Sequence, residues 1–270
     1  MKYLIILSAF LFLSLWCVGV VSAVSNDAAD IVTKMDTRYD GDSVIAEMTM
    51  ILINNNDQKR VRKIKSFSKD SGFYTKGVVF FLSPADVKDT AYLSYDWNGE
   101  RDDDSWLYLP ALRNVKRISS ADESRPFMGS DFSYADINGL DISDWSYRLV
   151  KISEFFEGQD TWVIEGKPQP EKFDKVVRET GYIKYKLWIL KSNHMMVKGK
   201  YWVKKGKKIK YFTAGDISLV DNVWTASIMK MVTTKKGKKE HETTLTISTI
   251  HYNKELKDNF FTTDRISRGL

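Results

Sequence analysis

Histidine is the side chain most often used for metal binding and for acid–base catalysis near neutral pH, and this chain has only three. His241 and Glu242 begin a pattern similar to the His-Glu-x-x-His motif of zinc proteases, but Leu245 stands where the second histidine belongs. His194 and His251 have no partner at a spacing that would hold a zinc ion. We therefore expect structural or exposed histidines, no bound metal and no other cofactor.

Other familiar catalytic patterns are also missing from the sequence. It contains no Gly-x-Ser-x-Gly nucleophile elbow, no P-loop and no dinucleotide-binding glycine pattern. Asp102, Asp103 and Asp104 could hold a calcium ion, but their spacing matches no known calcium loop, and a solvated acidic loop is the simpler interpretation. The sequence therefore predicts a protein that is not an enzyme.

The irregular stretch between residues 106 and 136 contains five aromatic side chains, Trp106, Tyr108, Phe127, Phe132 and Tyr134. Gly129, which allows close backbone approach, lies among them, next to a helix start that Ser130 or Asp131 would cap. Such a segment suits a mobile cover over an apolar cavity, whereas ordinary core packing is the plainer alternative. The candidate ligand-binding residues are Trp106, Tyr108, Leu109, Phe127, Met128, Phe132 and Tyr134.

Lysines form a second candidate surface. The sequence Lys-Lys-Gly-Lys-Lys occurs at residues 204–208 and again at 235–239, with one predicted turn between the two runs. Successive turns of an up-and-down sheet alternate ends, so both runs should lie at the same end and attract anionic lipid head groups or an acidic partner. Two solvated hairpin turns are the alternative. The candidate membrane- or partner-facing residues are Lys204, Lys205, Lys207, Lys208, Lys235, Lys236, Lys238 and Lys239. No nucleic-acid-binding motif is present, and we expect no nucleic-acid partner.

The first 23 residues have the pattern of a secretory signal peptide. Lys2 precedes an apolar run that ends at Val21-Ser22-Ala23, a small-residue site typical of cleavage after Ala23. A retained membrane anchor is the alternative, because the run could nearly span a bilayer. Cleavage would leave residues 24–270 as a single exported domain without cysteine, since Cys17 is the only one. Its stability would then come from buried apolar surface rather than from disulfides.

One helix followed by many strands is the pattern of the remaining chain. Apolar residues at helical spacing between Asp27 and Tyr39 predict an amphipathic helix capped by Asn26 or Asp27. Alternating polarity and turn residues then predict strands at 43–53, 58–68, 73–82, 90–97, 106–109, 145–155, 162–167, 182–190, 195–203, 208–216, 223–233 and 243–252. So many strands would form a strongly curved antiparallel sheet, which could enclose a cavity or have a filled core. The predicted fold class is mainly β with helices.

Several segments resemble one known family. The run Trp-Leu-Tyr-Leu-Pro-Ala-Leu-Arg at 106–113, Lys-Arg-Ile at 116–118 and Phe-Met-Gly-Ser-Asp-Phe-Ser-Tyr-Ala-Asp at 127–136 are similar to the signature of the outer membrane lipoprotein-sorting protein family, which is related to the periplasmic lipoprotein carrier LolA. Residues 36–39 and 81–88 fit the same family. The resemblance covers most of the chain after the apolar N-terminus.

This resemblance implies a half-closed antiparallel barrel whose concave, apolar side is covered by helices. It also implies a periplasmic carrier, monomeric, that binds lipid or the acyl chains of lipoproteins for transfer toward the outer membrane. An exporter of the resistance-nodulation-division (RND) class is the implied partner. Two alternatives stay open: a lipid-sensing or adaptor subunit of an envelope transporter without net transfer, and an enzyme that acts on a hydrophobic substrate.

Overall fold

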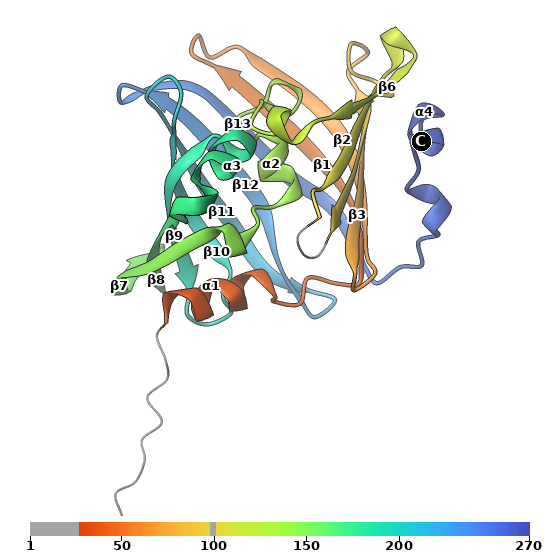
Figure 1. The fold of residues 1–270 in the computed structure, drawn as a ribbon. Coiled ribbons are helices and arrows are strands. Elements are labelled where there is room, and N and C mark those ends of the chain that lie inside the picture. Colours follow the sequence, from red (N-terminus) through yellow and green to blue (C-terminus); the bar gives the residue numbers. More distant parts are fainter. Residues whose placement is uncertain (1–26, 98–100) are drawn as a thin grey trace, which may run out of the picture.

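A single antiparallel sheet of 13 strands, strongly curved, dominates the chain (Figure 1). The structure is a computed structural model that describes residues 27–97 and 101–270. The predicted signal peptide, residues 1–23, lies outside the described residues. Within the described part of the chain, no helix has the length and apolar character needed to cross a membrane.

The strands follow one another in the sheet as two meanders joined at a single seam. The strands are β1 (Ser43–Asn54), β2 (Lys59–Asp70), β3 (Tyr74–Ser83), β4 (Ala91–Trp97), β5 (Asp104–Leu109), β6 (Asn114–Ile118), β7 (Trp145–Phe156), β8 (Gln159–Pro168), β9 (Tyr182–Leu190), β10 (Met196–Val203), β11 (Lys208–Val220), β12 (Val223–Lys235) and β13 (Lys238–Tyr252). Their spatial order is β6-β5-β4-β3-β2-β1-β13-β12-β11-β10-β9-β8-β7. The edge strands β6 and β7 do not pair, so the sheet stays open between them.

The predicted fold class is confirmed, and every predicted strand range overlaps an observed strand. Strand β6 and two α-helices, α3 (Phe173–Thr180) and α4 (Thr263–Ser267), were not predicted from the sequence. Strand β6 is short and carries charged residues, which weakens its alternating pattern. Helix α3 lies in a stretch to which the sequence analysis assigned no element.

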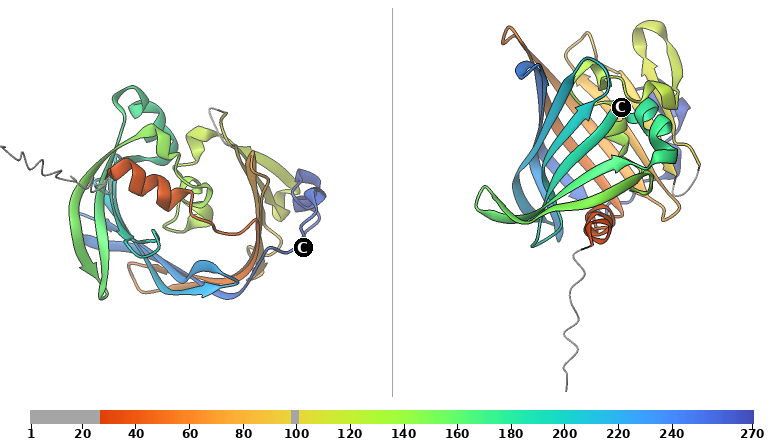
Figure 2. Two further views of the ribbon diagram at one scale, coloured as in Figure 1. Left: turned by 90° about the horizontal axis from the view of Figure 1, so that it is seen from below. Right: turned by 60° about the vertical axis from the view of Figure 1, so that its left-hand side comes forward.

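Helix α1 (Ala28–Asp36) crosses one open end of the curved sheet (Figure 2). Asp27 caps it, as predicted, because its carboxylate accepts a hydrogen bond from the Ala29 backbone N–H at 3.1 Å. Ile31 and Val32 are buried on the side that faces the sheet. The helix therefore closes this end with an apolar face.

Residues 119–144, which we call the covering segment, run over the concave side of the sheet and contain helix α2 (Tyr134–Asn138) (Figure 1). The prediction that Ser130 or Asp131 caps this helix is wrong. Ser133 is the cap: its hydroxyl accepts from the Asp136 N–H at 3.1 Å, and the Asp136 carboxylate accepts from the Ser133 N–H at 2.8 Å. The Ser-x-x-acid spacing of a capping box decides the start of the helix.

The C-terminal segment packs on the outer, convex face of β3, β4 and β5 and includes helix α4 (Thr263–Ser267). Phe261 and Ile266 are completely buried there against Phe80 and Leu93. The outer face of this half of the sheet is thus covered by the chain itself.

Candidate functional site

An apolar cavity of about 510 Å³ lies between the concave face of the sheet and the covering segment. Strand residues that point inward form its wall, among them Ile64, Leu187 and Phe212. Phe127 and Phe132 from the covering segment form its roof. The volume is within the range typical of protein pockets that take small ligands. The curved sheet therefore encloses a cavity. The sequence had left both a cavity and a filled core open.

Methionine is the characteristic side chain of this cavity. Six of the nine methionines of the chain line it: Met35, Met48, Met50, Met196, Met229 and Met231. Methionine side chains are flexible and polarisable, and they adapt to ligands of different shape. Sequence reasoning missed this lining, although the Met-x-Met spacing at 48–50 and at 229–231 places both methionines of each pair on one face of a strand.

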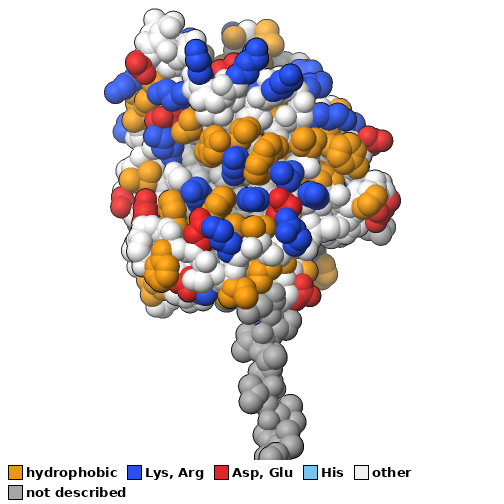
Figure 3. Space-filling view, turned by 90° about the vertical axis from the view of Figure 1, so that its left-hand side faces the viewer, with side chains coloured by type: hydrophobic (Ala, Val, Ile, Leu, Met, Phe, Trp, Pro, Cys, Tyr) orange, Lys and Arg blue, Asp and Glu red, His pale blue; other side chains and the backbone are white. Residues whose placement is uncertain are grey.

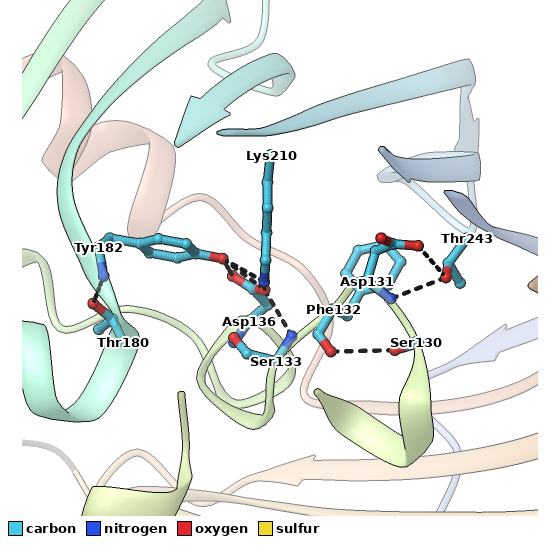
Figure 4. Close-up of polar contacts among 9 residues, drawn as sticks. All are labelled: Ser130, Asp131, Phe132, Ser133, Asp136, Thr180, Tyr182, Lys210 and Thr243. Atoms are coloured by element: carbon cyan, nitrogen blue, oxygen red, sulfur yellow. Dashed lines mark hydrogen bonds and ion pairs between the residues drawn. The ribbon is translucent and has the colours of Figure 1, made fainter. Parts of the chain in front are cut away.

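Helix α2 is fixed to the wall of the sheet by a buried polar cluster (Figure 4). Lys210 Nζ lies 3.1 Å from Asp136 Oδ2, and the Tyr182 hydroxyl donates to Asp136 Oδ1 at 2.8 Å. Burial raises the pKa of Tyr182 well above its usual value, and the Asp136 charge adds to this rise, so the hydroxyl stays protonated and can only donate to the carboxylate. A cation and a hydroxyl thus compensate the one carboxylate that faces the cavity from α2.

A second polar contact holds the loop that precedes α2. The Asp131 carboxylate accepts a hydrogen bond from Thr243 Oγ1 at 2.7 Å, and the Asp131 backbone N–H donates to the same hydroxyl oxygen at 3.0 Å (Figure 4). His241 Nδ1 lies 2.6 Å from the same carboxylate. Phe132, the next residue, is therefore held in the roof of the cavity from strand β13.

Five of the seven predicted ligand-binding residues lie on the cavity side of the sheet. Phe127 and Phe132 line the cavity directly. Tyr134 packs behind Phe127, with ring centroids 5.3 Å apart. Met128 and Leu109 are half-buried against the same core. The structure therefore brings together the part of the aromatic stretch that lies in the covering segment.

Trp106 and Tyr108 lie on the outer face of the sheet instead. Side chains alternate along β5, and because the intervening Leu107 points into the concave core, its two neighbours point out. The Trp106 ring packs against Tyr95 with centroids 5.4 Å apart, in the cluster that the C-terminal segment covers. In the sequence, the alternation of Trp106 and Tyr108 with Leu107 could have indicated that they face away from Leu107. The number of aromatic residues alone could not.

A second, acidic hollow of about 260 Å³, which we call the vestibule, adjoins the cavity near the open edge of the sheet. Four residues line both hollows: Asp36, Gly139, Leu140 and Ile142. The carboxyl groups that line the vestibule are those of Asp36, Asp96, Asp102, Asp103, Glu123, Asp141, Asp144 and Glu179. Only the aspartates at 102–104 were recognisable as an acidic group in the sequence, because the other carboxyl groups come from five separate segments of the chain.

Burial among like charges makes two of these carboxyl groups unusually weak acids. Burial, with the charges of Asp103 and other nearby carboxylates, raises the pKa of Glu123 to about 8. Burial, with Asp103 and other aspartates, likewise raises the pKa of Asp96 to about 7. Both groups therefore exist partly or mainly as neutral acids at neutral pH when nothing else occupies the vestibule.

Both lysine runs form hairpin turns, at 204–208 between β10 and β11 and at 235–239 between β12 and β13. Lys208 and Lys235 are direct partners across β11 and β12, so the runs lie side by side at one end of the sheet. Lys208 forms an ion pair with Glu240 at 2.7 Å, and Lys239 lies 3.6 Å from Asp57. The charge of this rim is therefore partly compensated.

Lysines also lie on the outer face of strands β9 and β10. Figure 3 shows this side, where lysine and arginine side chains lie among hydrophobic ones. Lys184 Nζ lies 4.2 Å from the centroid of the Trp202 ring, and Lys198 Nζ lies 4.6 Å from that of Trp188. These lysines stack on aromatic rings of the neighbouring strand and so cover apolar surface.

The three histidines have different neighbours. His194 packs against Trp162, His241 contacts Asp131, and His251 lies on the outer end of β13 opposite Ile45. Within residues 27–97 and 101–270, no group of three or more histidine, cysteine or acidic side chains is arranged to hold a metal ion.

Comparison with known proteins gives consistent results. A family model described as an uncharacterized protein family matches residues 74–268. The chain is 32% identical to a domain from Vibrio parahaemolyticus that is provisionally named an outer membrane lipoprotein-sorting protein, with a TM-score of 0.79 over 89% of this chain and 98% of that one. No match was found among curated protein sequences.

Two further solved structures are similar. A DUF1329 family protein from Desulfovibrio piger is 28% identical, with a TM-score of 0.78 over 88% of this chain and 97% of that one. A LolA superfamily protein from Nitrosomonas europaea is 19% identical, with a TM-score of 0.65 over 88% of this chain and 98% of that one. The latter shares the fold with this chain.

Proposed function

We propose that this chain, which belongs to the outer membrane lipoprotein-sorting protein family, is a carrier that binds lipid or the acyl chains of lipoproteins in its methionine-lined cavity and transfers them toward the outer membrane. The observation that carries the proposal is a cavity with an apolar, adaptable wall under a separate covering segment. Transfer of about ten methylene groups from water into such a cavity contributes roughly 8 kcal/mol before the cost of lost ligand freedom. That is enough for useful affinity.

Release of cargo requires the cover to open. Polar contacts hold the covering segment to strands in both halves of the sheet: Lys210 and Tyr182 contact Asp136, Thr243 contacts Asp131, Arg62 donates to the Met128 carbonyl, and Tyr92 donates to Asn138. Contacts of this kind can be exchanged for contacts with water when the cover lifts, and the apolar contacts of Phe127 and Phe132 would be replaced in part by contacts with the cargo. A carrier needs such a reversible closure, because tight binding alone would trap the cargo.

The proposed site of action is the periplasm. A signal peptide at residues 1–23 would direct export, and residues 24–270 would work there as a single domain and monomer. The family resemblance in the sequence favours an RND-class exporter as membrane partner, and the lysine rim offers a surface for an anionic membrane. Purification of the tagged chain from cell membranes, with and without mild crosslinking, tests whether an RND-class exporter binds to it. If no such transporter is recovered, this part of the proposal is removed.

Native mass spectrometry of protein from the periplasm, followed by extraction of bound lipid, tests the carrier. We expect a defined lipid or acylated peptide near one-to-one stoichiometry. Met229→Trp should fill the cavity and abolish the bound mass, because Met229 points inward. Ile228→Trp, on the outward-facing neighbour in the same strand, is the matched control and should leave it unchanged. Empty wild-type protein that also takes up no added lipid would overturn the proposal.

The two alternatives make different predictions. An adaptor would form a stable complex with a transporter but move no lipid between donor and acceptor vesicles. An enzyme on a hydrophobic substrate would need a buried titratable group, and Glu123 is a group of that kind. Loss of substrate turnover in Glu123→Gln would favour the enzyme, whereas lipid transfer that persists in this variant favours the carrier.

A further inference from the structure

We propose that the cargo carries a cationic nitrogen group, an amine or a guanidinium, which the acidic vestibule receives while the apolar part of the same molecule enters the cavity. This inference rests on the proposed carrier function and adds the chemical class of the head group. It is carried by the continuity of the two hollows, by the charge of the vestibule and by one buried carboxyl group without a partner.

The two hollows form one site with two chemical characters. Asp36 at the end of α1 and the 139–142 turn of the covering segment line both of them. On one side of this shared border lie methionine and phenylalanine side chains, and on the other side lie carboxyl groups. A ligand that fills both must be an amphiphile, with its head group in the vestibule.

The charge of the vestibule selects the head group. Eight carboxyl groups line it, against only two basic side chains, Arg101 and Lys175, although the whole chain has a formal charge of +6. Lys175 is paired with Asp144 at 2.9 Å, and Arg101 with Asp104 at 2.9 Å. Arg178, outside the lining, pairs with Glu179 at 2.9 Å, so two of the eight carboxylates are balanced and the other six have no ion-pair partner in the described part of the chain. An anionic head group would be repelled here, whereas a cation would be attracted.

Glu123 is the strongest single indication that the vestibule suits a cation. The residue is only 8% exposed and lines the vestibule, yet within residues 27–97 and 101–270 its carboxyl group has no hydrogen-bond or ion-pair partner. Asp36 and Asp96 also have no cationic partner in the described part of the chain. A buried carboxyl group without a partner costs stability, and a bound cation would remove this cost. Either protonation of these carboxyl groups or a cation in the vestibule lowers this cost.

An organic cation fits better than a metal ion. No three ligand side chains in the described ranges are arranged to hold a metal. Trp97 and Trp145 contribute aromatic surface to the lining, and aromatic faces attract ammonium and guanidinium groups. The Arg101 guanidinium already lies 3.7 Å from the centroid of the Trp97 ring, which demonstrates this mode of contact at the rim of the vestibule.

A matched pair of amphiphiles tests the head group. Lysophosphatidylethanolamine and its N-acetylated form have the same acyl chain and phosphate and differ in the cationic amine. We expect the amine form to bind the wild-type chain about tenfold more tightly or better, measured by calorimetry below the critical micelle concentration. Lysophosphatidylglycerol with the same acyl chain should bind no better than the N-acetylated form.

Variants assign the preference to the vestibule. Glu123→Gln and Asp96→Asn should each reduce the ratio between the two affinities severalfold while the N-acetylated ligand still binds. Glu171→Gln, an exposed glutamate outside the vestibule, is the control and should keep the wild-type ratio. Thermal unfolding of each variant identifies one that fails to fold, and Asp36→Asn then takes its place.

The possible outcomes distinguish the head-group inference from the carrier function. Equal affinity of wild-type protein for the amine and N-acetylated ligands would overturn the head-group inference and leave the carrier intact. An unchanged ratio in both carboxyl variants would also overturn it, because the preference would then arise elsewhere. Failure of every amphiphile to bind would instead remove the carrier function itself.

Discussion

Lys210 in β11 and Asp136 in α2 form an ion pair across the concave side of the sheet, with Nζ and Oδ2 3.1 Å apart. The two side chains are 14% and 8% exposed, so the pair is largely removed from water. It lies where the covering segment meets the wall of the cavity, and its strength should influence both the stability of the fold and the opening of the cover.

Lys210→Met should therefore destabilise the protein substantially. The substitution keeps the length of the side chain but leaves the buried Asp136 carboxylate with only the Tyr182 hydroxyl and the α2 cap as partners. We expect a loss of about 3 kcal/mol in the free energy of unfolding, measured by urea titration. Lys208→Met breaks the more exposed pair with Glu240 and should cost less than about 1 kcal/mol. Equal losses in the two variants would contradict the role given to Lys210.

Asp131→Ala should loosen the roof of the cavity. The variant removes the acceptor for Thr243 and the partner of His241, while Phe132 keeps its apolar contacts. A loss of about 1 to 3 kcal/mol is expected for a buried hydrogen-bonded carboxylate. Hydrogen exchange read by mass spectrometry should show faster exchange at residues 127–133. Asp264→Ala, at an exposed pair with Arg268, should leave this segment unchanged; faster exchange in both would show a general effect instead.

Stability should fall as the pH rises from about 5 to 8, and Glu123 should cause part of this fall. Its pKa is about 8 in the folded chain and about 4.5 when exposed, so between these values the folded state holds a proton that the unfolded state lacks. The contribution of the group is therefore fully present at low pH and is lost as the pH rises through 8. The charged groups that face it in the vestibule are Asp96, Asp102, Asp103, Glu179 and Lys175.

Glu123→Gln tests this pH dependence. The amide cannot ionise, so the variant should gain stability relative to the wild type as the pH rises, on the order of 1 kcal/mol or more at pH 8. Thermal unfolding at several pH values measures the difference. Parallel stability curves for the two proteins between pH 5 and pH 8 would show that Glu123 does not hold its proton in the folded state.

The lysine rim should bind anionic membranes through its unpaired members. Lys205, Lys207, Lys236 and Lys238 have no ion-pair partner among the described residues and lie in the two neighbouring turns. Lys204 also has no ion pair there, but it lies over the Phe173 ring. Their replacement by glutamate should abolish sedimentation with vesicles that contain anionic lipid, since each contributes about 1 kcal/mol near such a surface. Added salt should weaken wild-type binding in the same way. Replacement by glutamate of Lys184, Lys198 and Lys200, which lie over the Trp188 and Trp202 rings, provides the comparison. An equal loss there would move the membrane contact to that wall.

The sequence by itself determined most of the elements and their order, although β6, α3 and α4 were not predicted. Alternating polarity places strands within a few residues of their observed bounds, and Asp27 predicts the start of α1, because both signals depend on neighbours in the chain. The run from Trp106 to Asp136 was specific enough to indicate the family. Phe127 and Phe132 were chosen from that run and do line the cavity.

Only the tertiary structure decided which side chains share a site. Trp106 and Tyr108 point away from the cavity because β5 faces the covering segment with Leu107, and no local pattern says which face of a strand will be concave. The vestibule was even less predictable from the sequence than the cavity. Glu123 and Asp96 are 27 positions apart and look like ordinary surface acids in the sequence; their pKa values are raised because the fold buries both of them and places both near the charge of Asp103. Desolvation and Coulomb interaction depend on distance in space, and the order of residues along the chain does not contain that distance.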